Sequence, residues 1–358
     1  MNVVLWLAPY AVGRESVFYD ETKEAHVVLD KARGRYHGGD ESFPATVEME
    51  NRLAENVNLC PRTPATPTYL RELFRRVGSD NPSDGYWLDF QENVPFLCES
   101  QHRHTAPVGG GFERSQAAIK RSILETNPNA TVEVRYPSAN LNNKRFANLW
   151  QSIDFPGDFD AMRLCTLMMR PFSDGVVMGT DQMYWPMDAE DTTVARYVAT
   201  TVFTGVPAIG ANLLEGPPSH AEITRAWLGF YHAHQPGLTG GTFWPIGDFV
   251  EPDQKIESES ELFVYLRSGK TSEVNVRNTV SKVYVANCTN SDKIELTLHG
   301  LMAGEYRIET LSYLLQPVAQ QTTRFSNQAE IRGSVPQGGM MVITGELART
   351  EAVSTADD

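Results

Sequence analysis

Apolar and polar positions follow two alternating patterns along the first 240 residues. Short apolar runs typical of buried strands are followed by longer stretches in which apolar residues recur every three or four positions, as in amphipathic helices. This alternation predicts parallel βα units. The predicted strands are residues 3–8, 85–90, 131–136, 149–154, 175–179 and 206–210. The predicted helices are residues 69–77, with Gly78 as a stop signal, and 113–126, 159–169, 190–203 and 220–234.

The pattern changes near Val250, where short alternating strands bounded by Gly, Asn, Asp and Ser replace the helical periodicity. We therefore predict two domains: residues 1–249 form a (β/α) domain, and residues 250–348 form an antiparallel β-sandwich. Residues 349–358 are polar and are predicted to be a disordered tail.

A barrel is the favoured arrangement for the (β/α) domain. No G-x-G-x-x-G motif follows a predicted strand, and Gly109-Gly110-Gly111 is predicted to lie in a loop, so a dinucleotide-binding sheet lacks its phosphate cradle. A complete (β/α)8 TIM barrel has about 30 residues per unit. With six predicted strands, the expected fold is an incomplete barrel of strands three to eight, in a chain that lacks the first two units at its N-terminus.

Composition and charge exclude several classes of function. The chain of 358 residues has 31 Lys and Arg against 45 Asp and Glu, a net charge of −14, which argues against nucleic acid and anionic membranes as partners. The four cysteines are far apart and the His-x-His pairs have no third ligand at a defined spacing, so no metal and no cofactor is predicted. No signal peptide is evident, and the protein is predicted to be cytoplasmic.

Two aspartates close predicted strands at the edge where barrel enzymes carry their reactive groups. Asp89 ends one strand and Asp154 ends another, 65 positions later. That separation is close to two βα units, which would place the two carboxylates on alternate strands. Paired carboxylates suit glycoside hydrolysis. A lone strand-end Asp is more often a helix cap or the partner of an Arg, but these two have aromatic, acidic and guanidinium neighbours, typical of a sugar site. The neighbours are Trp87, Glu92, Trp150, Asp158 and Arg163.

These motifs resemble the retaining α-glycosidases of glycoside hydrolase families 27, 31 and 36. The family 36 α-galactosidases are the most similar, over residues 3–250. Residues 4–9 are similar to the third barrel strand of that family, and Trp87-Leu88-Asp89 to its nucleophile strand. Trp150-Gln151-Ser152-Ile153-Asp154 is similar to its acid/base strand. The resemblance implies that Asp89 is the nucleophile and Asp154 the acid/base, with no cofactor.

The chain departs from the family 36 pattern in two places. Trp87 stands where family 36 has a lysine, and Trp-x-Asp followed by Glu92 is closer to family 31. The acid/base motif has one extra residue, which leaves Asp158 as the alternative to Asp154.

The predicted function is hydrolysis of terminal α-linked sugars, most of all α-galactosides, by double displacement. Family 31-like α-glucosidase or α-xylosidase activity is the first alternative, and a non-catalytic sugar-binding remnant is the second. The predicted partner is an oligosaccharide or glycoside substrate, and an oligomer is possible. Residues predicted to bind the sugar are Trp6, Trp87, Glu92, Arg135, Trp150, Asp158, Arg163 and Asp181.

Overall fold

The computed structural model describes residues 3–26, 56–89, 91, 104–135, 139, 144–152, 154, 157–173, 175–247, 250–326 and 328–345. The chain divides into two compact units, Met1–Gln151 and Ser152–Asp358, which are described one at a time. None of the helices in these ranges is both long enough and apolar enough to cross a membrane.

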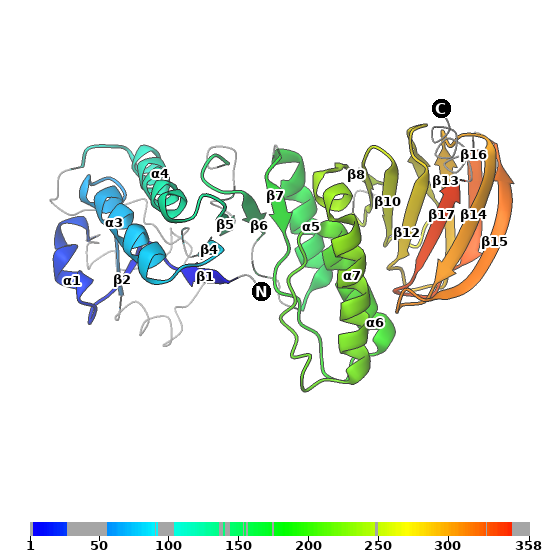
Figure 1. The fold of residues 1–358 in the computed structure, drawn as a ribbon, viewed down its shortest axis with the longest axis horizontal. Coiled ribbons are helices and arrows are strands. Elements are labelled where there is room, and N and C mark those ends of the chain that lie inside the picture. The colour runs from blue at the N-terminus through cyan, green and yellow to red at the C-terminus, as the bar shows by residue number, and fades with distance from the viewer. Residues whose placement is uncertain are drawn as a thin grey trace, which may run out of the picture. The chain divides into compact units, whose positions relative to one another are not determined.

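The first unit is built on parallel strands in the order β1-β4-β5-β6 (Figure 1). Their bounds are β1 Val4–Leu7, β4 Gly85–Leu88, β5 Thr131–Arg135 and β6 Leu149–Gln151. Helices α3, Ala65–Asp80, and α4, Val108–Thr126, pack side by side. The smaller elements are β2 Ala11–Gly13, β3 Asn56–Asn58, α1 Phe18–Glu21 and η1 Lys23–Ala25. Four predicted strands are thus confirmed in parallel order, but β6 ends at Gln151, so Asp154 does not close it as predicted.

The two faces of this sheet differ in chemistry because side chains alternate along a strand. One face carries Leu88, Val132 and Val134, all buried. Tyr86, on the same face, meets Phe74 of α3 edge to face at 5.8 Å between ring centroids. The opposite face carries polar and aromatic side chains, and it contains the candidate site.

Glycines allow close contacts of the two helices, one between α3 and α4 and one between α4 and Pro61, and these contacts correct two predictions. Gly109-Gly110-Gly111 is the beginning of α4 and not a loop, and a Cβ at Gly111 would lie 2.1 Å from the Pro61 carbonyl oxygen. Gly78 does not end α3, which continues to Asp80. A Cβ at Gly78 would lie 2.5 Å from Thr126 Oγ1, so this glycine serves the contact between α3 and α4.

The second unit begins with helices and one short strand. Their bounds are α5 Phe159–Met169, η4 Arg170–Phe172, β7 Val177–Gly179, α6 Asp191–Thr204 and α7 Pro218–Gly240. The strand predicted at 206–210 is reduced to two isolated parallel bridges, Gly179 to Val206 and Met183 to Ile209. Arg170 donates to the carbonyl oxygens of Thr204 and Leu238, near the C-termini of α6 and α7, where a cation complements the helix dipole. Burial lowers the pKa of Arg170 to about 10.

The remaining strands form two sheets that share one apolar core. The larger sheet has the order β15-β14-β17-β12-β10-β9-β8 and the smaller one β11-β13-β16. The bounds are β8 Thr242–Ile246, β9 Asp253–Glu257, β10 Glu261–Leu266, β11 Ser272–Asn275, β12 Lys282–Asn287, β13 Lys293–His299, β14 Gly304–Leu311, β15 Pro317–Phe325, β16 Gln328–Ser334 and β17 Met340–Gly345.

The prediction that this module is antiparallel throughout is wrong in two places. Strands β10 and β12 pair in parallel, and so do β11 and β13. The reason is the connectivity, because β11 lies in the other sheet and the chain returns to β12 by a crossover. The two compact units divide between Gln151 and Ser152, a different place from the predicted domain boundary. The boundary between residues 249 and 250 therefore stays a prediction.

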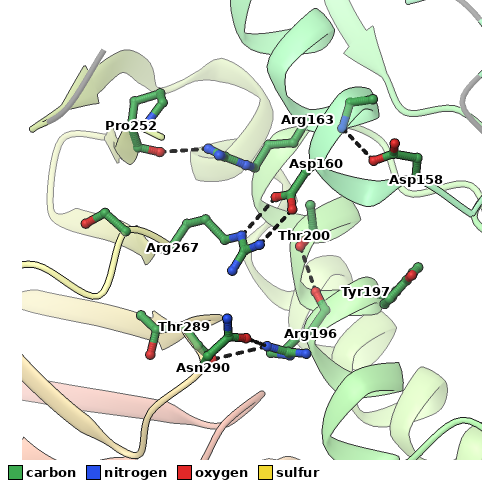
Figure 2. Close-up of polar contacts among 12 residues, drawn as sticks. Asp158, Asp160, Arg163, Arg196, Tyr197, Thr200, Pro252, Arg267, Thr289 and Asn290 are labelled. Carbon is green, nitrogen blue, oxygen red and sulfur yellow. Dashed lines mark hydrogen bonds and ion pairs between the residues drawn. The ribbon is translucent and has the colours of Figure 1, made fainter. Parts of the chain in front are cut away.

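Polar contacts join the helices of this unit to its strands (Figure 2). Arg267, just after β10, forms a bidentate ion pair with Asp160 of α5, at 2.8 and 2.6 Å. Arg196 of α6 contacts the carbonyl oxygen of Thr289 and the side chain of Asn290. Burial alone raises the pKa of Asp160. The hydrogen bonds and charge of Arg267, aided by the charges of Arg163 and Arg196, outweigh that effect and hold the pKa below its usual value.

We expect Asp160→Asn to make the stability of the protein less dependent on pH. Folding lowers the pKa of this carboxyl group from an unfolded value of about 4. The group therefore stabilises the folded state at pH values above about 4, and this stabilisation is lost as the pH falls through the pKa of the folded state. The variant should be about 1 kcal/mol less stable than the parent at neutral pH, the upper range for a partly exposed pair. The difference should shrink below about pH 4. Urea unfolding at several pH values measures this difference in stability. Arg332→Gln, which removes the exposed ion pair of Arg332 with Glu295 in the same unit, is the control.

Candidate active site

The register of the first unit places a row of chemically active side chains on one face of the sheet. Trp6 of β1 is in register with Trp87 of β4, which is in register with Glu133 of β5. One pleat further along, Arg135 of β5 is in register with Gln151 of β6. Asp89 follows Trp87 by two residues and therefore lies on the same face, at the carboxyl ends of the strands.

Asp89 is held by groups from the two neighbouring strands. Its backbone N–H donates to the Leu7 carbonyl oxygen at 2.8 Å, which extends the pairing of β4 with β1 by one residue. One carboxylate oxygen forms an ion pair with Arg135 Nη1 at 3.0 Å, and the other accepts a hydrogen bond from Trp6 Nε1 at 2.9 Å. The Asp89 residue is only 4% exposed. A buried carboxylate with a charged partner and a fixed orientation is suited to act as a nucleophile.

The two tryptophans beside Asp89 present different surfaces. Trp6 is 51% exposed although its Nε1 is bound to Asp89, so much of its ring is open to solvent. Trp87 is half-buried, and the guanidinium carbon of Arg135 lies 5.3 Å from the centroid of its ring. An exposed indole next to a fixed carboxylate is an arrangement that can stack on the C–H face of a sugar ring.

The sheet does not bring every predicted residue of this unit to that face. Trp150 is in register with Val134, on the face that packs against the helices, and it is buried. Its predicted contact with sugar stays a prediction, but its ring belongs to the apolar side of the sheet. Glu92 lies outside the described residues.

The other predicted residues lie in the second unit, where contacts within that unit define their surroundings. Asp154 is exposed, and its position as the acid/base stays a prediction. Asp158 accepts a hydrogen bond from the Ala161 N–H at 2.9 Å and so caps α5 (Figure 2). Arg163 is buried and donates to the Pro252 carbonyl oxygen at 2.7 Å. Asp181 is buried two residues after β7 and accepts from the Gln182 N–H at 2.8 Å.

Three residues near Asp89 were not predicted from the sequence. Glu133 and Gln151 lie on the face of Asp89, which becomes evident only once the strand register is known. Gln91 is buried two residues beyond Asp89. The spacing of 87, 89 and 91 is the signal that could have identified Gln91. Within the described part of the chain, no group of three or more His, Cys, Asp or Glu residues is placed to hold a metal ion.

Comparison with solved structures shows a glycoside hydrolase fold at low sequence identity. The α-galactosidase AgaA of Geobacillus stearothermophilus, of family GH36, is similar over 96% of this chain, with a TM-score of 0.59 and 13% identity. The α-galactosidase of Lactobacillus brevis is similar over the same share, with a TM-score of 0.57 and 14% identity. The chain spans 45% and 44% of these two proteins, less than half of their length.

An α-amylase of Geobacillus thermoleovorans, solved with acarbose, has a TM-score of 0.57 and 11% identity over 96% of this chain and 77% of its own. No family model matches the sequence, and no protein of curated function matches it. The likeness therefore shows the fold, a mixed α/β fold with a parallel sheet, as in these glycosidases. No closed barrel forms among the described strands.

Proposed function

We propose that this protein is a retaining glycoside hydrolase that acts on terminal α-linked sugars, with α-galactosides as its substrates. The observation that carries the proposal is the Asp89 carboxylate, fixed by Arg135 and Trp6 at the carboxyl end of β4 beside the exposed face of an indole. The fold shared with α-galactosidases and an α-amylase supports the class of reaction. Variants of AgaA have been crystallised with raffinose and stachyose, which supports the choice of α-galactosides.

The reaction would proceed in two displacements. Asp89 attacks the anomeric carbon as the bond to the leaving oxygen breaks, and Asp154 gives its proton to that oxygen. The product of this step is an ester between the sugar and Asp89. Water then attacks the anomeric carbon, its proton passes to Asp154, and the ester bond breaks to release the carboxylate of Asp89. The two inversions together leave the configuration of the sugar unchanged.

The direct test is a panel of nitrophenyl α-glycosides, with the first-formed sugar anomer followed by NMR. We expect hydrolysis of the α-galactoside and an initial product in the α configuration. A β product would contradict the retaining mechanism. Sugar binding without hydrolysis of any member would favour a non-catalytic sugar-binding protein.

A second candidate substrate class is supported by Trp87. This residue lies beside Arg135 on the face of Asp89, where the family 36 resemblance leads us to expect a lysine. An indole at this position is closer to the family 31 pattern, so an α-glucoside or α-xyloside preference is the alternative. Faster turnover of either glycoside than of the α-galactoside in the panel would select it.

Substitution of Asp154 and of Asp158 should have different effects, a loss of activity for Asp154 and a loss of stability for Asp158. Asp154→Ala should reduce hydrolysis of substrates with poor leaving groups by about 10²–10⁴-fold, with a smaller loss for nitrophenyl glycosides, because an activated leaving group needs less help from an acid. Added azide should restore turnover and give the α-glycosyl azide. Asp158→Ala should cost about 1 kcal/mol of stability through the lost cap of α5 and leave the rate near that of the parent. If Asp158→Ala lost activity and was rescued by azide while Asp154→Ala kept the parent rate, Asp158 would be the acid/base.

A further inference from the structure

Gln91 is a buried amide with unmet hydrogen-bonding capacity. The residue is 3% exposed, and neither its side-chain oxygen nor its side-chain nitrogen has a hydrogen-bond partner in the structure as described. The indole N–H of Trp87 is likewise buried without a partner. Roughly 90% or more of buried polar groups in proteins are paired, and a catalytic role or a bound group is one explanation of an exception.

Both residues flank Asp89 in the chain. Trp87 precedes it by two residues and Gln91 follows it by two, so that chain geometry limits each Cα to about 7 Å from that of Asp89. The carboxylate of Asp89 is bonded to Arg135 and Trp6. The unpaired groups therefore belong to the two residues that flank Asp89 in the chain, whose carboxylate is bonded to other side chains.

The chemistry of these groups selects one class of ligand. A glutamine amide offers two N–H donors and one carbonyl acceptor, whereas an indole offers one N–H donor. Sugar hydroxyl groups both donate and accept, so neighbouring hydroxyls can pair with an amide and with an adjacent indole N–H. The amide gives up no hydrogen bond when it rotates about its side-chain torsions toward a ligand, because it makes none in the free protein.

We propose that Gln91 is a specificity-determining residue that pairs with a hydroxyl group of the sugar bound at Asp89, with the indole N–H of Trp87 donating to a neighbouring hydroxyl. This inference rests on the proposed function and deepens it. It assigns hydroxyl recognition to a glutamine next to the nucleophile.

The test compares Gln91→Met, which keeps the length of the side chain without its polar atoms, with the parent on nitrophenyl α-galactoside and its monodeoxy analogues. The parent should turn over one of these analogues about 10–100-fold less efficiently, in kcat/KM, than the full substrate. Gln91→Met should lose a similar factor on the full substrate and show no further loss on that analogue. Trp87→Phe should remove the discrimination at a neighbouring hydroxyl. Unchanged discrimination at every hydroxyl in both variants would overturn the inference.

Thermal unfolding keeps this test separate from the test of the proposed function. In the free protein, Gln91→Met should raise the Tm by about 2 °C, because an unpaired buried amide is removed. D-galactose should raise the Tm of the parent and should do so less in the variant. If the parent hydrolyses no glycoside, the proposed function fails, and the shift with D-galactose still decides the role of Gln91. An equal shift in both proteins, or none in the parent, would overturn the inference.

Discussion

Asp89→Asn is expected to reduce hydrolysis of every substrate by about 10⁴-fold or more, with little change in the folded structure. The amide has the shape of the carboxylate and can still accept a hydrogen bond from Trp6 Nε1, but it has no charge with which to attack the anomeric carbon. Stopped assays with nitrophenyl glycosides measure the loss, and unfolding curves check that the variant is folded.

Asp84→Asn is the matched control for this variant. Asp84 immediately precedes β4, at the opposite end from Asp89, is exposed, and accepts from the Val3 N–H at 2.7 Å. Its substitution should leave kcat/KM within about twofold of the parent, because surface changes away from a site have small effects. Comparable activity in Asp89→Asn and the parent would remove Asp89 from the reaction.

Arg135→Met is expected to destabilise the protein by about 3–5 kcal/mol and to reduce activity strongly. The substitution breaks the ion pair between Arg135 and the buried Asp89 carboxylate, and breaking a buried ion pair costs far more than breaking an exposed one. Arg75→Met, which removes the exposed pair with Glu72, should change the stability very little and serves as the control.

The double variant Asp89→Asn with Arg135→Met separates the charge from packing. Removing both charges should recover a large part of the stability lost in Arg135→Met, because the buried carboxylate that lost the Arg135 charge is then absent as well. Urea unfolding of the four proteins gives the coupling free energy. If the losses of unfolding free energy in the two single variants simply add in the double variant, the ion pair between Asp89 and Arg135 does not stabilise the protein.

Much of the first unit could be predicted from the sequence, because period-two and period-3.6 patterns report which residues are buried. Asp89 could be found for the same reason, since it directly follows a buried strand. Its partners could not be read in the same way. Arg135 and Trp6 meet Asp89 only through the parallel register of three strands, which pattern alone does not specify.

The less accurate predictions have identifiable physical causes. Gly78 and Gly111 suggested a stop signal and a loop because glycine disfavours helices. A Cβ at Gly78 of α3 would clash with α4, however, and a Cβ at Gly111 of α4 would clash with Pro61. Tertiary contact overrode local propensity at both positions. The sugar contact expected of Trp150 stays a prediction, and the face of the sheet on which Trp150 lies depends on which residues of β6 pair with β5. The spacing of 87, 89 and 91 could have identified Gln91, but that its amide is buried without a partner is visible only in the structure.

The central claim is that Asp89 is the nucleophile of a retaining glycosidase. The most direct measurement is to trap the glycosyl ester with a fluorinated α-galactosyl fluoride that reacts quickly and turns over slowly, and then to locate the modified residue by peptide mass spectrometry. The account predicts one sugar per chain, on the peptide that contains Asp89, and no label in Asp89→Asn. A label on another carboxylate, or hydrolysis of the α-galactoside without any trapped ester, would contradict it.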